Sequence, residues 1–319
     1  MSKQIWAPFY NRRVNAPIDS TAAPSAPASG PAPVAAPWHG VDHYENFPVA
    51  SWLLPRRLRP AVIAIYRFAR HADDIADEGD ADADTRDRGL QALQQALATA
   101  AAGGEPGEPV VAALVRPVTA HRLDWHHFHD LLDAFRQDLR VRRYADAAAV
   151  DDYCRRSANP VGRLMLELFD AADPANLAAS DAICSALQRA NFLQDVVVDF
   201  AKDRIYLPLA TLAACGVDEA GFAADIRRGS FSTGTRRAVA VEAQRTREQL
   251  LRGRVLLRRV PLRLGLELRF VLAGALRILD RLQALDHDVA AGRPTLGWRD
   301  GPALVLKAAS LPRLQAGQP

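Results

Sequence analysis

Apolar residues recur at intervals of three and four along most of the chain, a spacing that predicts helices. The clearest case is the segment from Leu187 to Lys202, LQRANFLQDVVVDFAK. Wound as a helix, it leaves most of its circumference apolar, interrupted only by Arg189 and Gln194. Its other polar side chains form one narrow stripe, which consists of Gln188, Asn191, Asp195, Asp199 and Lys202. A helix that is apolar on nearly all sides belongs inside a protein, so this stripe is expected to face an internal cavity.

A second polar stripe is predicted on the segment 60–78, PAVIAIYRFARHADDIADE. Tyr66, Arg70, Asp73 and Asp77 follow one another at steps of four, three and four, beside a broad apolar face. Taken alone, such spacing also fits an ordinary solvated helix face. The stripe from Gln188 to Lys202 fits that alternative poorly, because its helix has almost no solvent side.

Turn and capping residues predict further helices around these two, with Thr85 and Asp124 as N-caps and a kink at Pro160. Their predicted ranges are 85–102, from 109 onward, 124–139, 147–169, from 180 onward, 234–259 and 261–286. Segments that alternate with period two and are rich in β-branched residues are absent. The sequence therefore predicts an all-α fold, a bundle of helices joined by short loops.

The composition indicates where the folded domain begins and excludes several classes of protein. Residues 15–37 are mostly Ala, Pro and Ser and cannot bury enough apolar surface to offset their ordering entropy. We therefore expect a disordered arm over 1–37, an all-α domain over 38–312 and a short tail over 313–319. Three cysteines without metal-ligand spacing indicate neither a disulfide framework nor a zinc site. A net charge of +3 without a basic block argues against nucleic acid as a partner.

The four aspartates of the two stripes need a positive partner. Burying an ionised carboxylate costs several kcal/mol unless it is paired or bound to a cation. With oxygen ligands only, the expected ion is Mg²⁺, which usually shares its coordination shell with phosphate oxygens. If the two stripes face each other across the bundle core, the ions between them would grip a diphosphate.

These segments resemble a known family. HADDIADE and NFLQDVVVDFAKDRIYLP resemble the two aspartate-rich signatures of the squalene and phytoene synthases, which are head-to-head isoprenoid synthases. Tyr153-Cys154 followed by Val161-Gly162 resembles the Tyr-Cys…Val-Gly helix between those signatures, and the similarity extends from about Tyr44 to the late helices. The resemblance implies an isoprenoid-synthase helical bundle around a central cavity, Mg²⁺ and a polyprenyl diphosphate substrate.

The resemblance also assigns residues position by position. As metal ligands it implies Asp73, Asp77, Asn191, Asp195 and Asp199, with Asp73 and Asp195 central to catalysis. As substrate-binding residues it implies Tyr66, Arg70, Gln188, Lys202 and Arg204, where the two arginines suit bidentate contacts with diphosphate oxygens. Tyr153 matches a tyrosine thought to assist proton handling or to stabilise a cation. A carbocation would also meet aromatic faces such as Phe47 and Phe192.

Three departures from the family pattern narrow the resemblance. The Ser-x-Ser-Phe-like element is YENFPVAS at 44–51, the usual Arg before Asp195 is Gln194, and SANP at 157–160 replaces a small Ala-Gly pair. Loss of a diphosphate-binding element matters least to an enzyme that handles one diphosphate. The run YENFPVASWLLPRRLRP with NFLQDV resembles the bacterial hopanoid-pathway branch, the hydroxysqualene synthases. These remove the diphosphate of presqualene diphosphate and capture the rearranged cation with water.

Several expectations follow from that branch. NADPH is not required if water ends the reaction, and the attacking water is held by Tyr153, Asn159 or Asn46, among which the sequence does not choose. The protein is expected in the cytoplasm, at the inner face of the membrane through residues 262–285, and a pathway-partner synthase is its candidate protein partner. The alternatives are a condensing squalene, presqualene diphosphate or phytoene synthase, and a non-catalytic assembly factor, which would tolerate loss of the aspartates.

Overall fold

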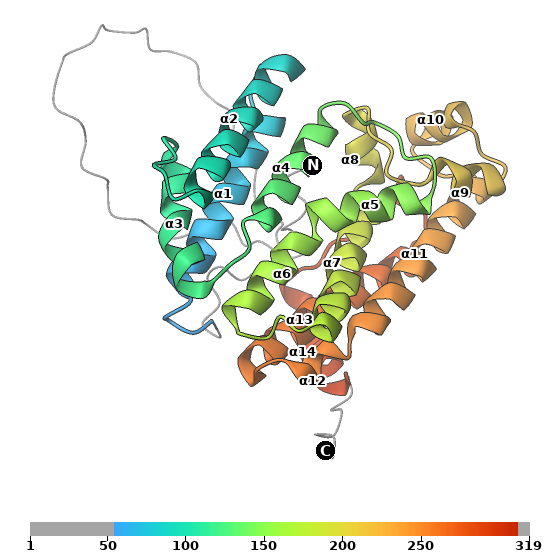
Figure 1. Ribbon diagram of the computed structural model, residues 1–319. Coiled ribbons are helices and arrows are strands. Elements are labelled where there is room, and N and C mark those ends of the chain that lie inside the picture. The colour runs from blue at the N-terminus through green and yellow to red at the C-terminus, as the bar shows by residue number, and fades with distance from the viewer. Residues whose placement is uncertain (1–53, 312–319) are drawn as a thin grey trace, which may run out of the picture.

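The computed structural model describes residues 54–311, except for the side chain of Trp298, and these residues form helices joined by short loops (Figure 1). In this range the only β-structure is an isolated bridge between Arg143 and Ile205, which confirms the all-α prediction. The helices are α1 (Arg59–Asp77), α2 (Ala83–Ala101), α3 (Pro109–His121), α4 (His126–Asp138), α5 (Ala147–Ser157), α6 (Asn159–Leu168), α7 (Pro174–Gln194), α8 (Val196–Ala201), α9 (Leu209–Ala214), α10 (Glu219–Arg228), α11 (Thr233–Gly253), α12 (Leu256–Arg259), α13 (Leu262–Ala284) and α14 (Gly301–Ser310), with a short 3₁₀ helix at Trp298–Asp300. The predicted arm and tail, and the candidates Asn46 and Phe47, lie outside the described residues.

Capping residues explain where the observed helix starts differ from the predicted ones. The N-cap of α2 is Asp82, whose Oδ1 accepts a hydrogen bond from the Thr85 amide at 2.7 Å, so Thr85 lies inside the helix. Asp173 caps α7 in the same way, and this helix begins at Pro174 instead of near residue 180. Asp124 accepts a hydrogen bond from the His126 amide, and α4 begins at that histidine.

Three predicted helices are interrupted. The predicted kink near Pro160 is a break at Ala158, because the proline in the first turn of α6 has no N–H to continue the ladder of α5. The segment 234–259 divides into α11 and α12. The segment 187–202 is interrupted at Asp195, which ends α7 and precedes α8. The short helices α9, α10 and α14 were not predicted.

The predicted burial of the central helix is observed. Helix α7 packs mainly against α11 and α6, with further contacts to α13 and α5, and most residues of its C-terminal half are buried. Helix α1 packs instead against α2, α3 and α4. The two polar stripes therefore belong to different groups of packed helices. None of the helices within residues 54–311 combines the length and the hydropathy needed to cross a bilayer.

We expect Gly253→Ala to destabilise the fold by about 1–3 kcal/mol through overpacking. A Cβ at this last residue of α11 would lie 2.5 Å from Ile183 Cγ1 and 2.7 Å from the Ala179 carbonyl oxygen, so α11 would have to move away from α7. Urea unfolding measures the change in free energy. Gly301→Ala is the control, because a Cβ there meets nothing within 4 Å. An equal midpoint for both variants would contradict close packing of α11 on α7.

Candidate functional site

The break after α7 positions the second acidic motif. Asp195 is buried, and its Oδ1 accepts a hydrogen bond from Arg293 Nε, which comes from the loop after α13. One turn further, in α8, Asp199 is also buried, and neither of its carboxylate oxygens has a hydrogen-bond donor among the described residues. One carboxylate of this motif is therefore paired with an arginine, and the other has no hydrogen-bond partner there.

The first acidic motif shows the same division. Asp77 lies at the end of α1 and accepts hydrogen bonds from Arg204 Nη2 at 3.0 Å and Lys202 Nζ at 3.2 Å. Asp73 is buried one turn earlier, and its Oδ2 has no hydrogen-bond donor within the described range. Arg70 Nη1 lies 3.5 Å from that oxygen, too far for a hydrogen bond.

Arg204 joins the two motifs. Its buried guanidinium contacts both oxygens of Asp77 and donates a longer hydrogen bond, 3.4 Å, to the backbone carbonyl of Asp138. Its backbone amide donates a 2.9 Å hydrogen bond to the Asp199 carbonyl, and its charge lowers the pKa of Asp199 against the larger effect of burial. The segment that follows α8 therefore brings the second motif to the first.

Burial controls the charges of these groups. Burial raises the pKa values of Asp73 and Asp199 to about 7. Burial also raises the pKa of Asp195, although the hydrogen bond from Arg293 opposes this effect. Asp77 is the exception: burial favours its neutral form, but the hydrogen bonds and charge of Arg204 hold its pKa well below the usual range. Asp73 and Asp199 are therefore the two carboxylates that lack sufficient positive charge.

The residues present fit Mg²⁺ held jointly with a phosphate group. No three His, Cys, Asp or Glu side chains gather closely enough to hold a metal by themselves anywhere in residues 54–311. Oδ2 of Asp73 and both carboxylate oxygens of Asp199 nevertheless have no hydrogen-bond donor there, and a cation would satisfy them. Mg²⁺ commonly binds through one or two carboxylates and completes its shell with water and phosphate oxygens. The arrangement suits such a shared site better than an all-protein cage.

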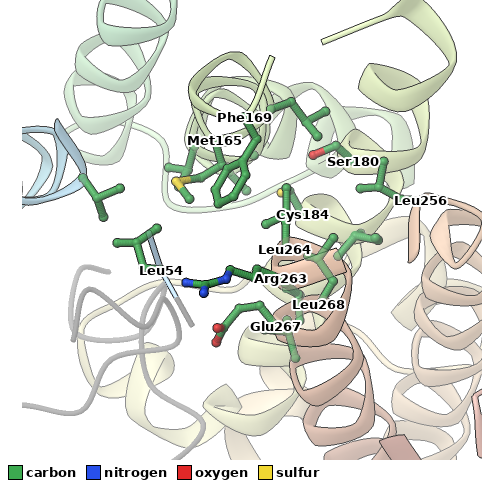
Figure 2. Close-up of a pocket in the computed structure, with 18 of the residues that line it drawn as sticks. Leu54, Met165, Phe169, Ser180, Cys184, Leu256, Arg263, Leu264, Glu267 and Leu268 are labelled. Atoms are coloured by element: carbon green, nitrogen blue, oxygen red, sulfur yellow. The ribbon is translucent and has the colours of Figure 1, made fainter. Parts of the chain in front are cut away.

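An apolar cavity lies between α7, which ends at the second motif, and α13 (Figure 2). It encloses about 1020 Å³ including its open mouth, and its walls come mainly from α6, α7, α12 and α13. Gln188, two turns before Asp195 on α7, lines it, and the buried Oε1 of this residue has no hydrogen-bond donor among the described residues. Arg263 and Glu267 of α13 are the charged side chains of its lining. The lining of the cavity suits an apolar chain whose polar end lies near Gln188.

Tyr153 lies in a separate aromatic cluster. It is fully buried, and its hydroxyl donates a 2.8 Å hydrogen bond to Asp138 Oδ2. Burial raises the pKa of Tyr153 well above its usual range and that of Asp138 to about 6. Phe192 belongs to the same cluster and stacks on Tyr206 at a ring-centroid distance of 3.9 Å. Neither Tyr153 nor Phe192 lines the large cavity, and their predicted roles stay predictions.

The remaining predicted residues have more local partners. Asn159 Oδ1 accepts a hydrogen bond from Ser185 Oγ at 2.9 Å, and Asn191 is buried one turn before Asp195. Tyr66 is half-buried on α1. Arg70 forms its short contacts with Asp74 at 2.6 Å and Glu78 at 2.9 Å. Both of these acids lie outside the predicted stripe, so this helix turns its arginine partly away from that stripe.

Sequence reasoning missed two residues of the site. Asp138 carried a usable signal, because it follows Leu131 and Ala134 on the apolar face of α4, where an acid is unexpected. Arg293 carried none, because it lies in an irregular loop far along the chain from Asp195. Gln194 was noted as a departure, and its amide donates a 2.6 Å hydrogen bond to the Pro294 carbonyl of the same loop.

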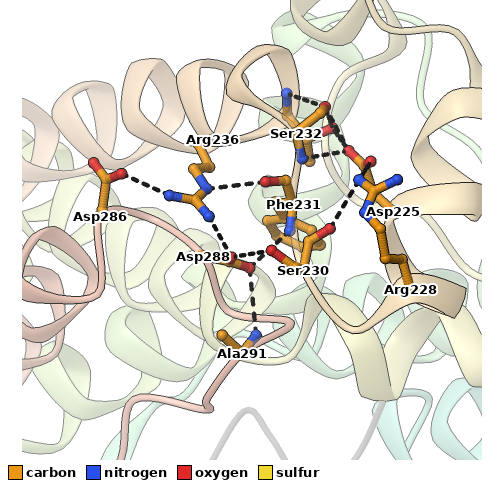
Figure 3. Close-up of polar contacts among 10 residues, drawn as sticks. Asp225, Arg228, Ser230, Phe231, Ser232, Arg236, Asp286, Asp288 and Ala291 are labelled. Atoms are coloured by element: carbon orange, nitrogen blue, oxygen red, sulfur yellow. Dashed lines mark hydrogen bonds and ion pairs between the residues drawn. The ribbon is translucent and has the colours of Figure 1, made fainter.

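A network of hydrogen bonds fastens this loop to the rest of the fold (Figure 3). Asp288 is buried and accepts hydrogen bonds from Ser230 Oγ and the Phe231 amide at 2.9 Å each, and from Arg236 Nη2 at 2.8 Å. The Ala291 amide, within the loop itself, also donates to it. The loop that carries Arg293 is therefore tied to the start of α11.

We expect Asp288→Ala to destabilise the protein by about 1–3 kcal/mol, because several buried donors would lose their acceptor. Amide hydrogen exchange over residues 285–297, followed by mass spectrometry, is expected to become faster. Asp286→Asn is the control, since the Asp286 side chain is 80% exposed and bonds Arg236 at the surface. Unchanged exchange in Asp288→Ala would show that the network does not hold the loop.

A family model described as squalene/phytoene synthase matches residues 41–300. The chain belongs to the squalene/phytoene synthase family. That membership agrees with the resemblance inferred from the aspartate-rich motifs. It also makes the protein an isoprenoid diphosphate-dependent synthase.

Two curated members of the family are similar over most of the chain. The hydroxysqualene synthase of Zymomonas mobilis is 39% identical over 212 residues, 65% of this chain and 68% of the relative. The hydroxysqualene synthase of Rhodopseudomonas palustris is 38% identical over 244 residues, 76% of this chain and 80% of the relative. Among solved structures, squalene synthase HpnC from Alicyclobacillus acidocaldarius superposes with a TM-score of 0.70 at 38% identity, over 77% of this chain and 90% of that one.

Proposed function

We propose that this synthase converts presqualene diphosphate to hydroxysqualene, with Mg²⁺ and without NADPH. The carbon–oxygen bond to diphosphate breaks, the cation rearranges, water adds its oxygen to the cation, and one proton leaves that oxygen. The proposal agrees with the names of the two similar curated relatives. A separate synthase that makes presqualene diphosphate would have to supply the substrate.

The observation that carries the proposal is the meeting of both acidic motifs at the end of α7, the helix that also forms a wall of the apolar cavity. Arg204 and Lys202 reach from the second motif to Asp77 of the first, and Gln188 leads from the second motif into the cavity. A substrate with a charged head and a long hydrocarbon body matches this combination. An enzyme for such a substrate needs its cation-binding residues and its apolar cavity close to each other.

In this proposal the acidic side chains bind the metal and the basic side chains bind the diphosphate. Mg²⁺ held by Asp73, Asp77, Asn191, Asp195 and Asp199 would neutralise the diphosphate and stabilise its charge as it leaves. Arg204, Lys202 and Arg293 bind diphosphate oxygens, and in the absence of substrate they pair with Asp77 and Asp195. The arginines therefore exchange a carboxylate for a phosphate when substrate binds.

The apolar walls of the cavity protect the cation. The cavity excludes bulk water, so that only a positioned molecule reaches the reacting carbon. Tyr153 stays protonated, and its hydroxyl donates a hydrogen bond to Asp138; this buried pair, outside the cavity lining, is one candidate to orient that water. Asn159, whose Oδ1 already accepts from Ser185, is a second candidate.

Gln194 supports a substrate with one diphosphate. Where many family members carry an arginine, this chain has a buried amide that bonds the Pro294 carbonyl. That position therefore contributes to the structure of the loop and offers no cation to a second diphosphate. A condensing synthase, which binds two diphosphates, would lose an anion-binding group here.

The experiment is incubation of the purified protein with presqualene diphosphate and Mg²⁺ in H₂¹⁸O, with and without NADPH. We expect hydroxysqualene that carries one ¹⁸O, at a yield that NADPH does not change. Squalene formed only with NADPH would contradict the proposal, as would consumption of farnesyl or geranylgeranyl diphosphate to a condensation product. Lack of turnover of any of these substrates would favour the non-catalytic assembly-factor alternative.

A further inference from the structure

The outer face of α13 carries a stripe of exposed apolar side chains. Leu262 is 77% exposed, Leu266 37% and Phe270 40%, and steps of four residues place them along one side of the helix. Val255, just before α12, is exposed to a similar degree at 44%. Burial of these side chains against an apolar phase would be favourable, since the protein itself leaves them in contact with solvent.

Arginines surround this stripe. Residues 251–270 contain six arginines and a single acid, Glu267. Arg254 and Arg258 are exposed, and neither forms an ion pair with another described residue. Desolvation lowers the pKa of Arg258, and the charges of Arg269 and Arg254 lower it further. The face is therefore both apolar and positively charged.

The same helices form one wall of the hydrocarbon cavity. Leu256 of α12 and Leu264, Leu268 and Val271 of α13 point inward, whereas the exposed stripe occupies the neighbouring side of α13. Figure 2 shows Arg263 and Glu267 extending from α13 on the side of Leu54. In Figure 1, α12, α13 and α14 lie together at one end of the molecule. One short segment thus separates the cavity from the apolar and cationic surface.

We propose that the exposed face of residues 254–270 docks on a bilayer that contains anionic phospholipid. The proposal rests on the proposed function, because docking there would let a long hydrocarbon pass between the bilayer and the cavity across α12 and α13. Arginines that flank apolar side chains match an interface where anionic headgroups lie above acyl chains. A soluble protein partner would have to supply acids and an apolar groove in the same arrangement.

Vesicle flotation with the full chain and no substrate tests the docking independently of catalysis. Wild-type protein is expected to float with phosphatidylcholine vesicles that contain phosphatidylglycerol, to float less with phosphatidylcholine alone, and to be released by high salt. Arg254→Ser with Arg258→Ser is expected to lower partitioning about 20–30-fold, because each cation near an anionic surface contributes about fivefold. Leu262→Ser with Phe270→Ser is expected to lower it at least about tenfold.

A control variant on α11, Arg237→Ser with Val241→Ser, removes one exposed arginine and one side chain that is 42% exposed. It is expected to float like the wild type. Equal flotation of all variants, or no binding to anionic vesicles, would overturn the proposal. So would self-association that Leu262→Ser abolishes, since the occupant of the face would then be a second copy. In each case turnover in detergent would still report on the proposed reaction separately.

Discussion

Asp199→Asn is expected to lower turnover on the order of 10³-fold and at the same time to stabilise the protein. The carboxylate is buried without a hydrogen-bond donor in the described structure, and burial raises its pKa to about 7. Asparagine keeps the shape and removes the charge, so it loses the proposed metal ligand and also the repulsion from Asp195. We expect a gain of about 2–4 kcal/mol in unfolding free energy at pH 8 without metal.

The pH dependence fixes the sign of this effect. The pKa of Asp199 is about 7 in the folded state and near 3.8 in the unfolded state, so folding favours the protonated form. The stabilisation that comes from protonated Asp199 is complete below about pH 4 and is lost as the pH rises through 7. Wild type and Asp199→Asn are therefore expected to melt at similar temperatures near pH 4 and to diverge by pH 8.

Differential scanning fluorimetry from pH 4 to 8, with and without Mg²⁺ and pyrophosphate, measures this divergence. Addition of both ligands at pH 8 is expected to raise the melting temperature of the wild type and to leave that of the variant nearly unchanged. Asp84→Asn, an exposed acid on α2, is the control for a simple change of charge. Retained turnover in Asp199→Asn would remove this residue from the proposed metal site.

Arg204→Met is expected to cost about 3 kcal/mol of unfolding free energy and at least about 100-fold in turnover. The guanidinium is buried and bonds both oxygens of Asp77, whose contact with Lys202 Nζ at 3.2 Å would remain. Removing one member of a buried pair leaves the other charge uncompensated, and this costs more than the pair itself contributes.

A double variant separates the two effects. Asp77→Asn with Arg204→Met removes both charges and is expected to recover most of the stability without recovering turnover. Arg155→Met is the control, because Arg155 and Asp152 are both half-exposed and such a pair contributes at most about 1 kcal/mol. Urea unfolding at pH 7.5 gives the free energies. Recovered turnover in the double variant would show that Arg204 acts only on stability.

The helical class and the burial of Asp73, Asp195 and Asp199 were predictable because both depend on local spacing. Period-3.6 patterns identified α1 and the interior position of α7, and the two motifs identified the aspartates. The break at Asp195 was not predictable from the pattern, since LQRANFLQDVVVDFAK reads as one continuous helix. The contacts of Arg204 with Asp77 and of Arg293 with Asp195 join residues about 100 positions apart. Such pairs depend on how the helices pack against one another, and the spacing of residues within one helix carries no information about that packing.

Binding of Mn²⁺, a paramagnetic substitute for Mg²⁺, tests the central claim most directly. Electron paramagnetic resonance of free Mn²⁺, titrated with protein in the presence of pyrophosphate, reports the bound fraction. We predict that binding requires pyrophosphate and is lost both in Asp73→Asn, on α1, and in Asp199→Asn, on α8, because both motifs hold the same metal–diphosphate group. Undiminished Mn²⁺ and pyrophosphate binding in either variant would contradict the account.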